Sequence, residues 1–301
     1  MIVQWLIAGF FTAVASLSYK ALFGYGFNGS NLSITNLVST AWVVSTDTTW
    51  VGTARRHLAG ASYGTGRAIF GYGYAAAGSS ITNLVDTAWV VATDTTWVGT
   101  ARWELAAAGY GADKALFGYG AAWATRYSLT NLVSNTWVVS SDTTWVGTAR
   151  TLLAATSYGT DKAIFWYGSS PGYVSMTNLV ANTWVVSSDT TGVGTARAYI
   201  SASWYGTDRA LFWYGYTGSA SSITNLVSNT WVVSSDTTWV GTARWDLSAS
   251  RYGTDKALFW YGTNGGFVSM TNLVSNTGVV STDTTWVGTA RDRVASSFYG
   301  T

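Results

Sequence analysis

The 301-residue chain contains no cysteine, one proline and few charged residues, which make up 10% of the composition. Without cysteine there is no disulfide framework and no thiolate metal site. Sixteen lysines and arginines stand against 14 aspartates and glutamates, so the net charge is only +2. A protein that binds nucleic acid needs a strong positive field. We therefore expect no nucleic acid as a partner.

Side chains that could support catalysis are equally scarce. The chain has a single histidine, His57, a single glutamate, Glu104, and a single glutamine, Gln4. A nucleophile–base–acid arrangement or a histidine-based metal site cannot be assembled from this inventory. A glycine-rich phosphate loop is also absent from the sequence. The sequence predicts that the protein is not an enzyme and that it uses no cofactor and no metal.

Internal repetition dominates what the sequence does contain. The tetrapeptide Thr-Asn-Leu-Val occurs six times at steps of 47 or 48 residues, starting at Thr35, Thr82, Thr130, Thr177, Thr224 and Thr271. A Thr-Ala-Arg tripeptide and a Lys/Arg-Ala-Leu/Ile-Phe series follow the same period. A fixed period of this length indicates an array of supersecondary units. At the position of His57 the other copies carry Glu, Leu, Tyr, Asp and Arg, so we interpret His57 as a variable surface residue.

Each copy predicts four short β-strands. In the third copy the strands are expected at residues 105–110, 114–119, 127–133 and 136–140. Small apolar, β-branched and aromatic residues dominate these segments, and helical periodicity is absent. Four strands in about 40 to 50 residues, repeated six times, are typical of an all-β six-bladed β-propeller with four antiparallel strands per blade. A β-solenoid is the alternative, but it would need atypical capping repeats.

The N- and C-terminal segments are expected to complete one blade together. The last copy ends at residues 298–301, and the first copy begins at Tyr19, where the repeat would continue. Residues 294–300 would then supply the inner strand of the blade whose other strands come from residues 19–46. Such closure removes the free edges of an open array. We therefore predict an apolar segment at 1–18 and a propeller domain at 19–301.

The repeat resembles the kelch family. Thr148-Ala149-Arg150 is similar to the part in which an arginine precedes the inner strand, and Trp166-Tyr167-Gly168 replaces the glycine pair that ends the family's next strand. Asn182-Thr183-Trp184 is similar to its Asn-x-Trp motif. A weaker likeness joins residues 140–145, Ser-Ser-Asp-Thr-Thr-Trp, to the Asp-box turn of sialidase-type and lectin propellers. Both resemblances imply a propeller, and neither transfers a function.

Most of the charges recur once per copy. The arginines of the Thr-Ala-Arg series are Arg55, Arg102, Arg150, Arg197, Arg244 and Arg291. The aspartates of the Asp-Thr-Thr series are Asp47, Asp94, Asp142, Asp189, Asp236 and Asp283. Repetition with balanced charge predicts structural pairing within or between blades, worth about 0–1 kcal/mol for an exposed pair. A ring of cations that holds an anionic ligand at the channel mouth is the alternative.

Tryptophan recurs at several positions of the copies. One series consists of Trp50, Trp97, Trp145, Trp239 and Trp286, which we consider as ligand-binding residues because flat aromatic rings suit the apolar face of a sugar. Ordinary blade packing is the alternative. Another position holds glycine in three copies and tryptophan in the other three, namely Gly24, Gly71, Gly118, Trp166, Trp213 and Trp260. Such an exchange in a core costs several kcal/mol, which suggests that these rings lie on a blade edge, in solvent or against a partner. Ordinary blade packing with local compensation is the alternative for this series too.

Residues 1–18 are uncharged and lie outside the repeat. Ala13-Val14-Ala15 matches a signal-peptide cleavage site, although no Lys or Arg precedes the apolar stretch. As a membrane span the segment is at the short limit, and a span is not favoured. Retention for packing, for plugging the channel or for assembly with another subunit is a further reading.

Taken together, the sequence predicts a non-enzymatic binding or structural scaffold that serves adhesion or assembly. Its expected partners are a glycan, a protein surface or further copies of itself, and an extracellular or particle-surface location is favoured. A multivalent lectin is one alternative, because six similar units could offer several weak sites. A subunit of a fibre or ring assembled through residues 1–18 is another. The ligand itself cannot be identified from the sequence.

Overall fold

The computed structural model describes residues 20–299, apart from positions 40–42, 49–51, 65, 89, 96–98, 112, 144–146, 160, 184, 191, 231, 238–240 and 285–287. Two sequence predictions fall outside the described residues and stay predictions. One is the N-terminal segment 1–18. The other is the tryptophan series of Trp50, Trp97, Trp145, Trp239 and Trp286.

The described residues form six three-stranded antiparallel sheets, two two-stranded sheets and no helix. We number the larger sheets 1 to 6 and give each from its inner to its outer strand. Sheet 1 consists of β22 (Ala295–Tyr299), β1 (Lys20–Gly24) and β2 (Thr35–Val38), sheet 2 of β3 (Ala59–Ser62), β4 (Ala68–Gly71) and β5 (Thr82–Val85), and sheet 3 of β6 (Ala106–Tyr110), β7 (Lys114–Gly118) and β10 (Thr130–Val133). Sheet 4 consists of β11 (Ala154–Tyr158), β12 (Lys162–Trp166) and β15 (Thr177–Val180), sheet 5 of β16 (Ser201–Tyr205), β17 (Arg209–Tyr216) and β18 (Ala220–Val227), and sheet 6 of β19 (Ser248–Tyr252), β20 (Lys256–Trp260) and β21 (Thr271–Val274). The small hairpins are β8 (Ala121–Ala122) with β9 (Thr125–Arg126), and β13 (Ser169–Ser170) with β14 (Gly172–Tyr173). The prediction of an all-β fold built from small antiparallel sheets is confirmed.

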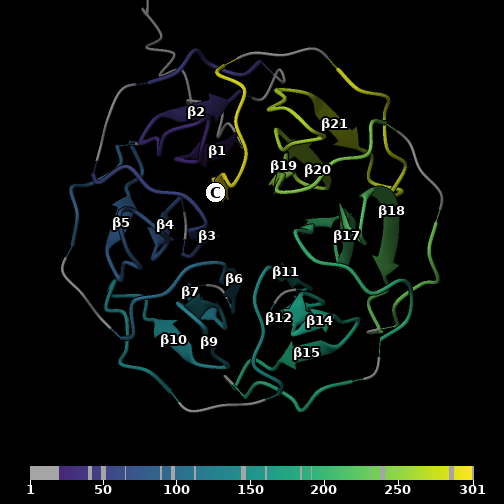
Figure 1. The fold of residues 1–301 in the computed structure, drawn as a ribbon, viewed down its shortest axis with the longest axis horizontal. Coiled ribbons are helices and arrows are strands. Elements are labelled where there is room, and N and C mark those ends of the chain that lie inside the picture. The colour runs from purple at the N-terminus through teal and green to yellow at the C-terminus, as the bar shows by residue number, and fades with distance from the viewer. Residues whose placement is uncertain are drawn as a thin grey trace, which may run out of the picture.

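The six larger sheets lie around a central opening (Figure 1). Their inner strands contact one another in the order β22, β3, β6, β11, β16 and β19, and β19 also contacts β22. In sheet 1, β22 pairs with β1 from Lys20 opposite Tyr299 to Gly24 opposite Ala295. Segments from the two ends of the described chain therefore share one sheet.

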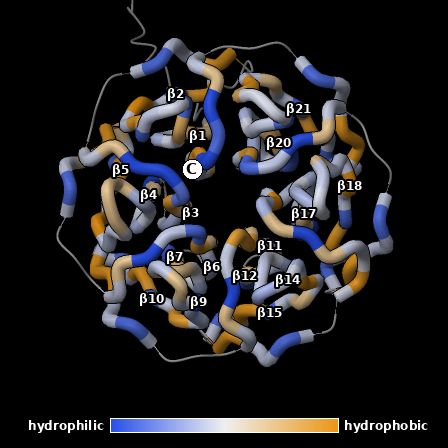
Figure 2. Tube along the Cα trace, viewed as in Figure 1, coloured by the Kyte–Doolittle hydropathy of each residue, from blue (hydrophilic) through white to orange (hydrophobic). Residues whose placement is uncertain are grey.

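The residue types of each strand match its distance from the axis. Inner strands crowd together at the centre and consist largely of Ala, Gly and Ser, as in β3 with Ala-Gly-Ala-Ser. The apolar residues of the middle strands are buried, as in β4 with Ala-Ile-Phe-Gly, because neighbouring sheets cover these strands on both faces. The third strands alternate between half-buried and buried residues, as in β2. The hydropathy pattern recurs from sheet to sheet, with hydrophilic segments along the perimeter (Figure 2).

The fourth strand expected in each copy is not a regular strand. In sheet 1 the outer segment meets β2 through two isolated bridges, Val38 with Val44 and Thr35 with Thr48. The bridges are three residues apart on β2 and four on the outer segment, so the outer segment carries one extra residue and the ladder breaks as at a β-bulge. The hydroxyl Oγ of Ser45 accepts a hydrogen bond from the backbone N–H of Leu37 at 2.8 Å, which satisfies the donor at the break. The prediction of four ladder strands in each copy is therefore corrected to three strands and a bridged outer segment in the described residues.

The tryptophans that alternate with glycine are buried, so a place on an edge, in solvent or against a partner is wrong, and the alternative of ordinary packing with local compensation is confirmed. Trp166, Trp213 and Trp260 are at most 2% exposed. The Trp166 ring stacks on Phe212 of the next sheet, with 3.7 Å between the ring centroids. In the glycine copies the next phenylalanine fills the same space, since a Cβ on Gly118 would lie 2.6 Å from Cζ of Phe165. The total side-chain volume between the sheets stays similar, because the phenylalanine of the next sheet occupies the space that tryptophan leaves in the glycine copies. Comparing the copies at one position alone does not show this compensation.

The arginine of each Thr-Ala-Arg tripeptide joins two adjacent sheets. Arg197 packs its guanidinium over the ring of Tyr167 in sheet 4, at 4.9 Å from the centroid. On its other side it donates from Nε to the carbonyl oxygen of Tyr214 at 2.8 Å and from Nη2 to Oδ1 of Asn225 at 2.5 Å, both in sheet 5. Arg197 and Asn225 are fully buried. The planar fork of arginine suits this set of acceptors.

An aspartate completes the same network. Asn225 donates from Nδ2 to Oδ1 of Asp236 at 2.9 Å, and the Thr195 hydroxyl donates to Oδ2 of Asp236 at 2.6 Å. Nη1 of Arg197 lies 3.9 Å from Oδ1 of Asp236. Burial opposes ionisation of Asp236, but the hydrogen bonds from Thr195 and Asn225 and the charge of Arg197 outweigh it and hold the pKa of Asp236 below its usual range. We call this set of Thr, Arg, Asn and Asp the arginine clamp.

The arginine clamp recurs between all six pairs of neighbouring sheets. Its Arg–Asp pairs are Arg55–Asp94, Arg102–Asp142, Arg150–Asp189, Arg197–Asp236, Arg244–Asp283 and Arg291–Asp47. The arginine side chains are fully buried and the aspartate side chains are 24–30% exposed, so these are not the exposed pairs of the sequence argument. The pair of Arg291 with Asp47 joins sheet 6 to sheet 1. The charges of both repeated series thus hold neighbouring sheets together.

Candidate functional site

The candidate site lies where the copies differ, at the residue that enters each inner strand. This residue stands two places after the clamp arginine, and it has a different identity in every copy. The six residues, which we call the axial ring, are His57, Glu104, Leu152, Tyr199, Asp246 and Arg293. All of them line one cavity of about 150 Å³ at the end of the inner strands. The sequence interpretation of His57 as a variable surface residue is thus corrected, because it is half-buried in this shared cavity.

The backbone fixes the axial ring independently of its side chains. Each ring residue has a left-handed φ, between 52° at His57 and 57° at Leu152. The backbone N–H of Glu104 donates to the carbonyl oxygen of His57 at 3.0 Å, and the same bond repeats from each ring residue to the one before it as far as Arg293. A left-handed conformation costs roughly 1–2 kcal/mol for a residue other than glycine. These five backbone hydrogen bonds join the six residues without using their side chains, which is compatible with the six different residue types at this position.

Acidic groups and one arginine form a tight cluster on one side of the axial ring. Nε of Arg293 lies 3.3 Å from Oδ2 of Asp246, and Nη1 of Arg293 lies 3.6 Å from Oδ1 of Asp292. Asp246 is 8% exposed and Asp292 is 2% exposed. None of these three atoms of the buried cluster, Arg293 Nε, Asp246 Oδ2 and Asp292 Oδ1, makes a hydrogen bond within the described part of the chain. Such buried polar atoms are expected to pair with a ligand or with water.

Burial shifts the protonation of this cluster toward neutral pH. It raises the pKa of Asp246 to about 8, against the opposing charge of Arg293 and with the support of the charges of Asp292 and Glu104. It also raises the pKa of Asp292 to about 6, although Arg293 and Arg56 act in the opposite direction. Asp246 can therefore donate a hydrogen bond from its protonated carboxyl group at neutral pH, whereas Asp292 mostly accepts.

The other side of the axial ring offers neutral and acidic hydrogen-bonding groups. Burial, together with the charges of Arg293 and Arg56, lowers the pKa of His57 to about 3, so its imidazole is neutral at physiological pH. Burial raises the pKa of Glu104, although a hydrogen bond from Thr151 opposes the shift. Burial also raises the pKa of Tyr199 to about 12, so the phenol keeps its proton. The cavity therefore combines donors, acceptors and the apolar side chain of Leu152.

The wall below the axial ring is built from small residues of the inner strands. A second cavity of about 120 Å³ follows the first along these strands, and its lining includes Gly60, Ala107 and Ala155. A third, of about 370 Å³, opens at their other end. The axial ring thus occupies one mouth of a series of cavities along the axis.

The variation of the axial ring is visible in the sequence, but its meaning is not. The signal was available, because a position that differs in all six copies contrasts with the invariant clamp residues beside it. What the sequence could not give is the direction of the side chains, which depends on the left-handed turn before each inner strand. The repeated arginines and aspartates, by contrast, lie away from the axial ring cavity.

The described residues contain no cluster of three or more His, Asp or Glu side chains that could hold a metal ion. Among the same residues, no helix has the length and apolar character to cross a membrane. No protein-family model matches the chain, and no significant relative was found among curated proteins.

Proposed function

We propose that the chain forms a closed six-bladed, kelch-like β-propeller that acts as a non-enzymatic binding module. Three observations support closure with six blades. The inner strands contact one another in a complete cycle, β22 pairs with β1, and Arg291 clamps sheet 6 to Asp47 of sheet 1. Each blade would consist of a three-stranded sheet and the bridged outer segment.

We place the ligand site of this module in the axial ring cavity, and we propose a small polyhydroxylated ligand of monosaccharide size. The observation that carries this proposal is the convergence of six different side chains in one cavity on an otherwise repeated scaffold. A cavity of about 150 Å³ is smaller than the roughly 300–1,000 Å³ of pockets for drug-sized ligands. It therefore suits a small molecule.

The chemistry of the axial ring favours hydroxyl groups over a simple ion. Glu104 offers carboxylate oxygens that accept from hydroxyls, and Arg293 and protonated Asp246 offer donors. The ring of Tyr199 and the side chain of Leu152 offer apolar surface for C–H groups. Acidic and basic groups are mixed, so a ligand with a single strong charge would meet repulsion from one of them.

Saturation-transfer NMR with free hexoses tests this proposal. The probes are glucose, galactose and mannose, each added to the full chain. We expect transfer to at least one of them, and we expect the Glu104→Gln variant to weaken it, because a charge-assisted acceptor is lost. Asp208→Asn is the matched control, since Asp208 lies outside the axial cavity and pairs with Asn229.

Two outcomes would count against the proposed function. No transfer to any hexose, or equal transfer in Glu104→Gln and wild type, would remove the axial ring as a sugar site. Conversion of a hexose into a product during the experiment would contradict the non-enzymatic part of the proposal.

A further inference from the structure

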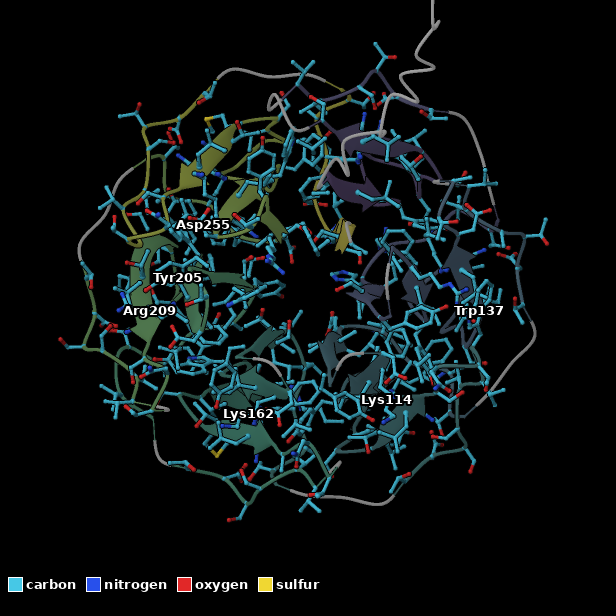
Figure 3. All side chains as sticks on the ribbon, turned by 180° about the vertical axis from the view of Figure 1, so that it is seen from behind. Lys114, Trp137, Lys162, Tyr205, Arg209 and Asp255 are labelled. Atoms are coloured by element: carbon cyan, nitrogen blue, oxygen red, sulfur yellow. The ribbon has the colours of Figure 1, made fainter. Side chains whose placement is uncertain are left out.

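The other end of the inner strands holds a larger cavity of different chemistry. It has a volume of about 370 Å³ and lies where the inner strands turn into the middle strands. This mouth is on the face seen in Figure 3, where Lys114, Lys162 and Arg209 lie in successive sheets around the opening. It shares no lining residue with the axial ring cavity.

The shape of this cavity comes from a second position at which the copies differ. The residue before the tyrosine at the end of each inner strand is small in sheets 2, 3 and 4 and large in sheets 5, 6 and 1. The six residues are Ser62, Gly109, Ser157, Trp204, Arg251 and Phe298. All of them line the cavity, so the small residues leave room on one side and the large ones form the opposite wall.

Three cations stand on the open side. Arg67 directly precedes the middle strand of sheet 2, whereas Lys114 and Lys162 begin those of sheets 3 and 4, and all three line the cavity. The equivalent cations of sheets 5 and 6, Arg209 and Lys256, are not among the lining residues. Among the described cations of this series, the cavity therefore reaches those of the sheets whose inner strand ends in a small residue.

Cations outnumber carboxylates around the open side, where Asp113 and Asp161 each precede a lysine. Gly66 precedes Arg67 where the later copies have an aspartate, so Arg67 has no adjacent acid in the sequence. Nζ of Lys114 lies 3.8 Å from Oδ1 of Asp113, but Asp113 also accepts a hydrogen bond from Asn135 at 2.9 Å and is not part of the lining. The described lining residues include no carboxylate.

The opposite wall adds a fourth cation between aromatic rings. The guanidinium of Arg251 lies 3.5 Å from the ring centroid of Trp204 and 4.7 Å from that of Phe298. Its Nη2 donates to the carbonyl oxygen of Thr254 at 2.6 Å. Stacking fixes the plane of the guanidinium, so its charge is held at the cavity wall instead of moving into solvent.

We propose that this mouth is a second binding site, for a small polyanion such as a phosphate ester or a polycarboxylate. Three cations in an arc and a fixed guanidinium opposite them would surround such an ion from both sides. The net charge of the chain is only +2, so the attraction comes from this local arrangement and not from the field of the whole protein.

Calorimetric titration of the full chain with inorganic pyrophosphate at low salt tests the site. We expect saturable binding, and we expect Arg67→Gln and Lys162→Gln each to raise the dissociation constant about fivefold, the effect of losing about 1 kcal/mol of charge interaction. The matched controls are Arg209→Gln and Lys256→Gln, which remove cations of the same repeated series outside the cavity. We expect both controls to bind as the wild type does.

A filling variant tests the shape. Ser157→Trp places a large residue over the open side, as Trp204 does in sheet 5, and we expect it to abolish binding while the thermal unfolding temperature stays close to that of the wild type. Absence of binding to the wild type would overturn the proposal. So would an equal loss in Arg209→Gln and Arg67→Gln, or full binding by a folded Ser157→Trp variant. Hexose binding at the axial ring does not enter these outcomes, so the two sites fail or succeed separately.

Discussion

The arginine clamp and the axial ring are adjacent in the sequence, but the clamp residue is the same in every copy and the ring residue differs in every copy. Arg197 of the clamp is repeated in every copy, whereas Tyr199, two residues later, has a different counterpart in each. The clamp arginine must reach fixed partners on two sheets, and no other residue type supplies the same planar set of donors. The ring side chain points into the axis, and its backbone is held without its help. Identical positions therefore build the scaffold, and divergent positions give it different chemistry at its two mouths.

The strongest way to break this comparison is to remove a clamp partner. Asn225→Leu leaves the buried Arg197 without its Oδ1 acceptor and removes one of the donors to Asp236. Loss of one member of a buried ionic network costs about 3–5 kcal/mol. Urea unfolding measures the effect, and Asn229→Leu is the control, because Asn229 also donates to an aspartate, Asp208, but is exposed. A similar loss for both variants would contradict the structural role of the clamp.

The packing between sheets should give the next largest effect. Trp213→Ala removes the ring that packs on Phe259, with 4.2 Å between the centroids. Truncation of a buried tryptophan costs about 3–5 kcal/mol, and we expect a value near 3 because Phe259 can move inward as Phe165 does over Gly118. Urea unfolding of the variant checks the value. A loss below about 1 kcal/mol would mean that the ring is not part of the core.

The axial ring should show itself in the pH dependence of stability. The pKa of Asp246 is raised to about 8 in the folded chain, so its contribution to stability is full below the ordinary aspartate pKa and is lost as the pH rises through 8. We expect wild type to lose stability steadily relative to Asp246→Asn as the pH rises from 5 to 8. Urea unfolding at several pH values measures the difference. Parallel curves for the two proteins would show that Asp246 is not buried as described.

His57 should give a smaller effect of opposite sign. Its pKa is lowered to about 3, so its contribution is present above the ordinary histidine pKa and is lost as the pH falls below about 6.5. His57→Gln should therefore be more stable than wild type at pH 4 and nearly equal to it at pH 8. Thermal unfolding of both proteins at the two pH values tests this prediction. If His57 were exposed to solvent, the difference in unfolding temperature between His57→Gln and wild type would be the same at both pH values.

Much of the scaffold follows from the sequence because each strand has its own residue types. The period, the order of the strands and the small residues of the inner strands are all visible in the copies. The break in the outer segment is not, because it depends on one extra residue between Val44 and Thr48 and on a hydroxyl that replaces a backbone acceptor. The burial of Trp166 is also hidden, because its partner Phe212 comes from the next copy.

The candidate site was harder to predict than the scaffold. Each ring residue alone looks like surface variation, and only the left-handed turn before the inner strand brings the six side chains to one cavity. The same holds for the opposite mouth, where Ser157 and Trp204 occupy equivalent positions and only the arrangement of the sheets shows that one opens the cavity and the other closes it.

The most direct test of the division between scaffold and site is an all-leucine axial ring. Leucine already occupies the position in sheet 4, at Leu152 with φ 57°, so the substitution is compatible with the backbone. The variant carries His57→Leu, Glu104→Leu, Tyr199→Leu, Asp246→Leu and Arg293→Leu, and it is compared with wild type by hexose saturation-transfer NMR and by thermal unfolding. We expect a folded protein, with cooperative thermal unfolding, that has lost hexose binding and keeps pyrophosphate binding. A folded variant that still binds the hexose would contradict the account.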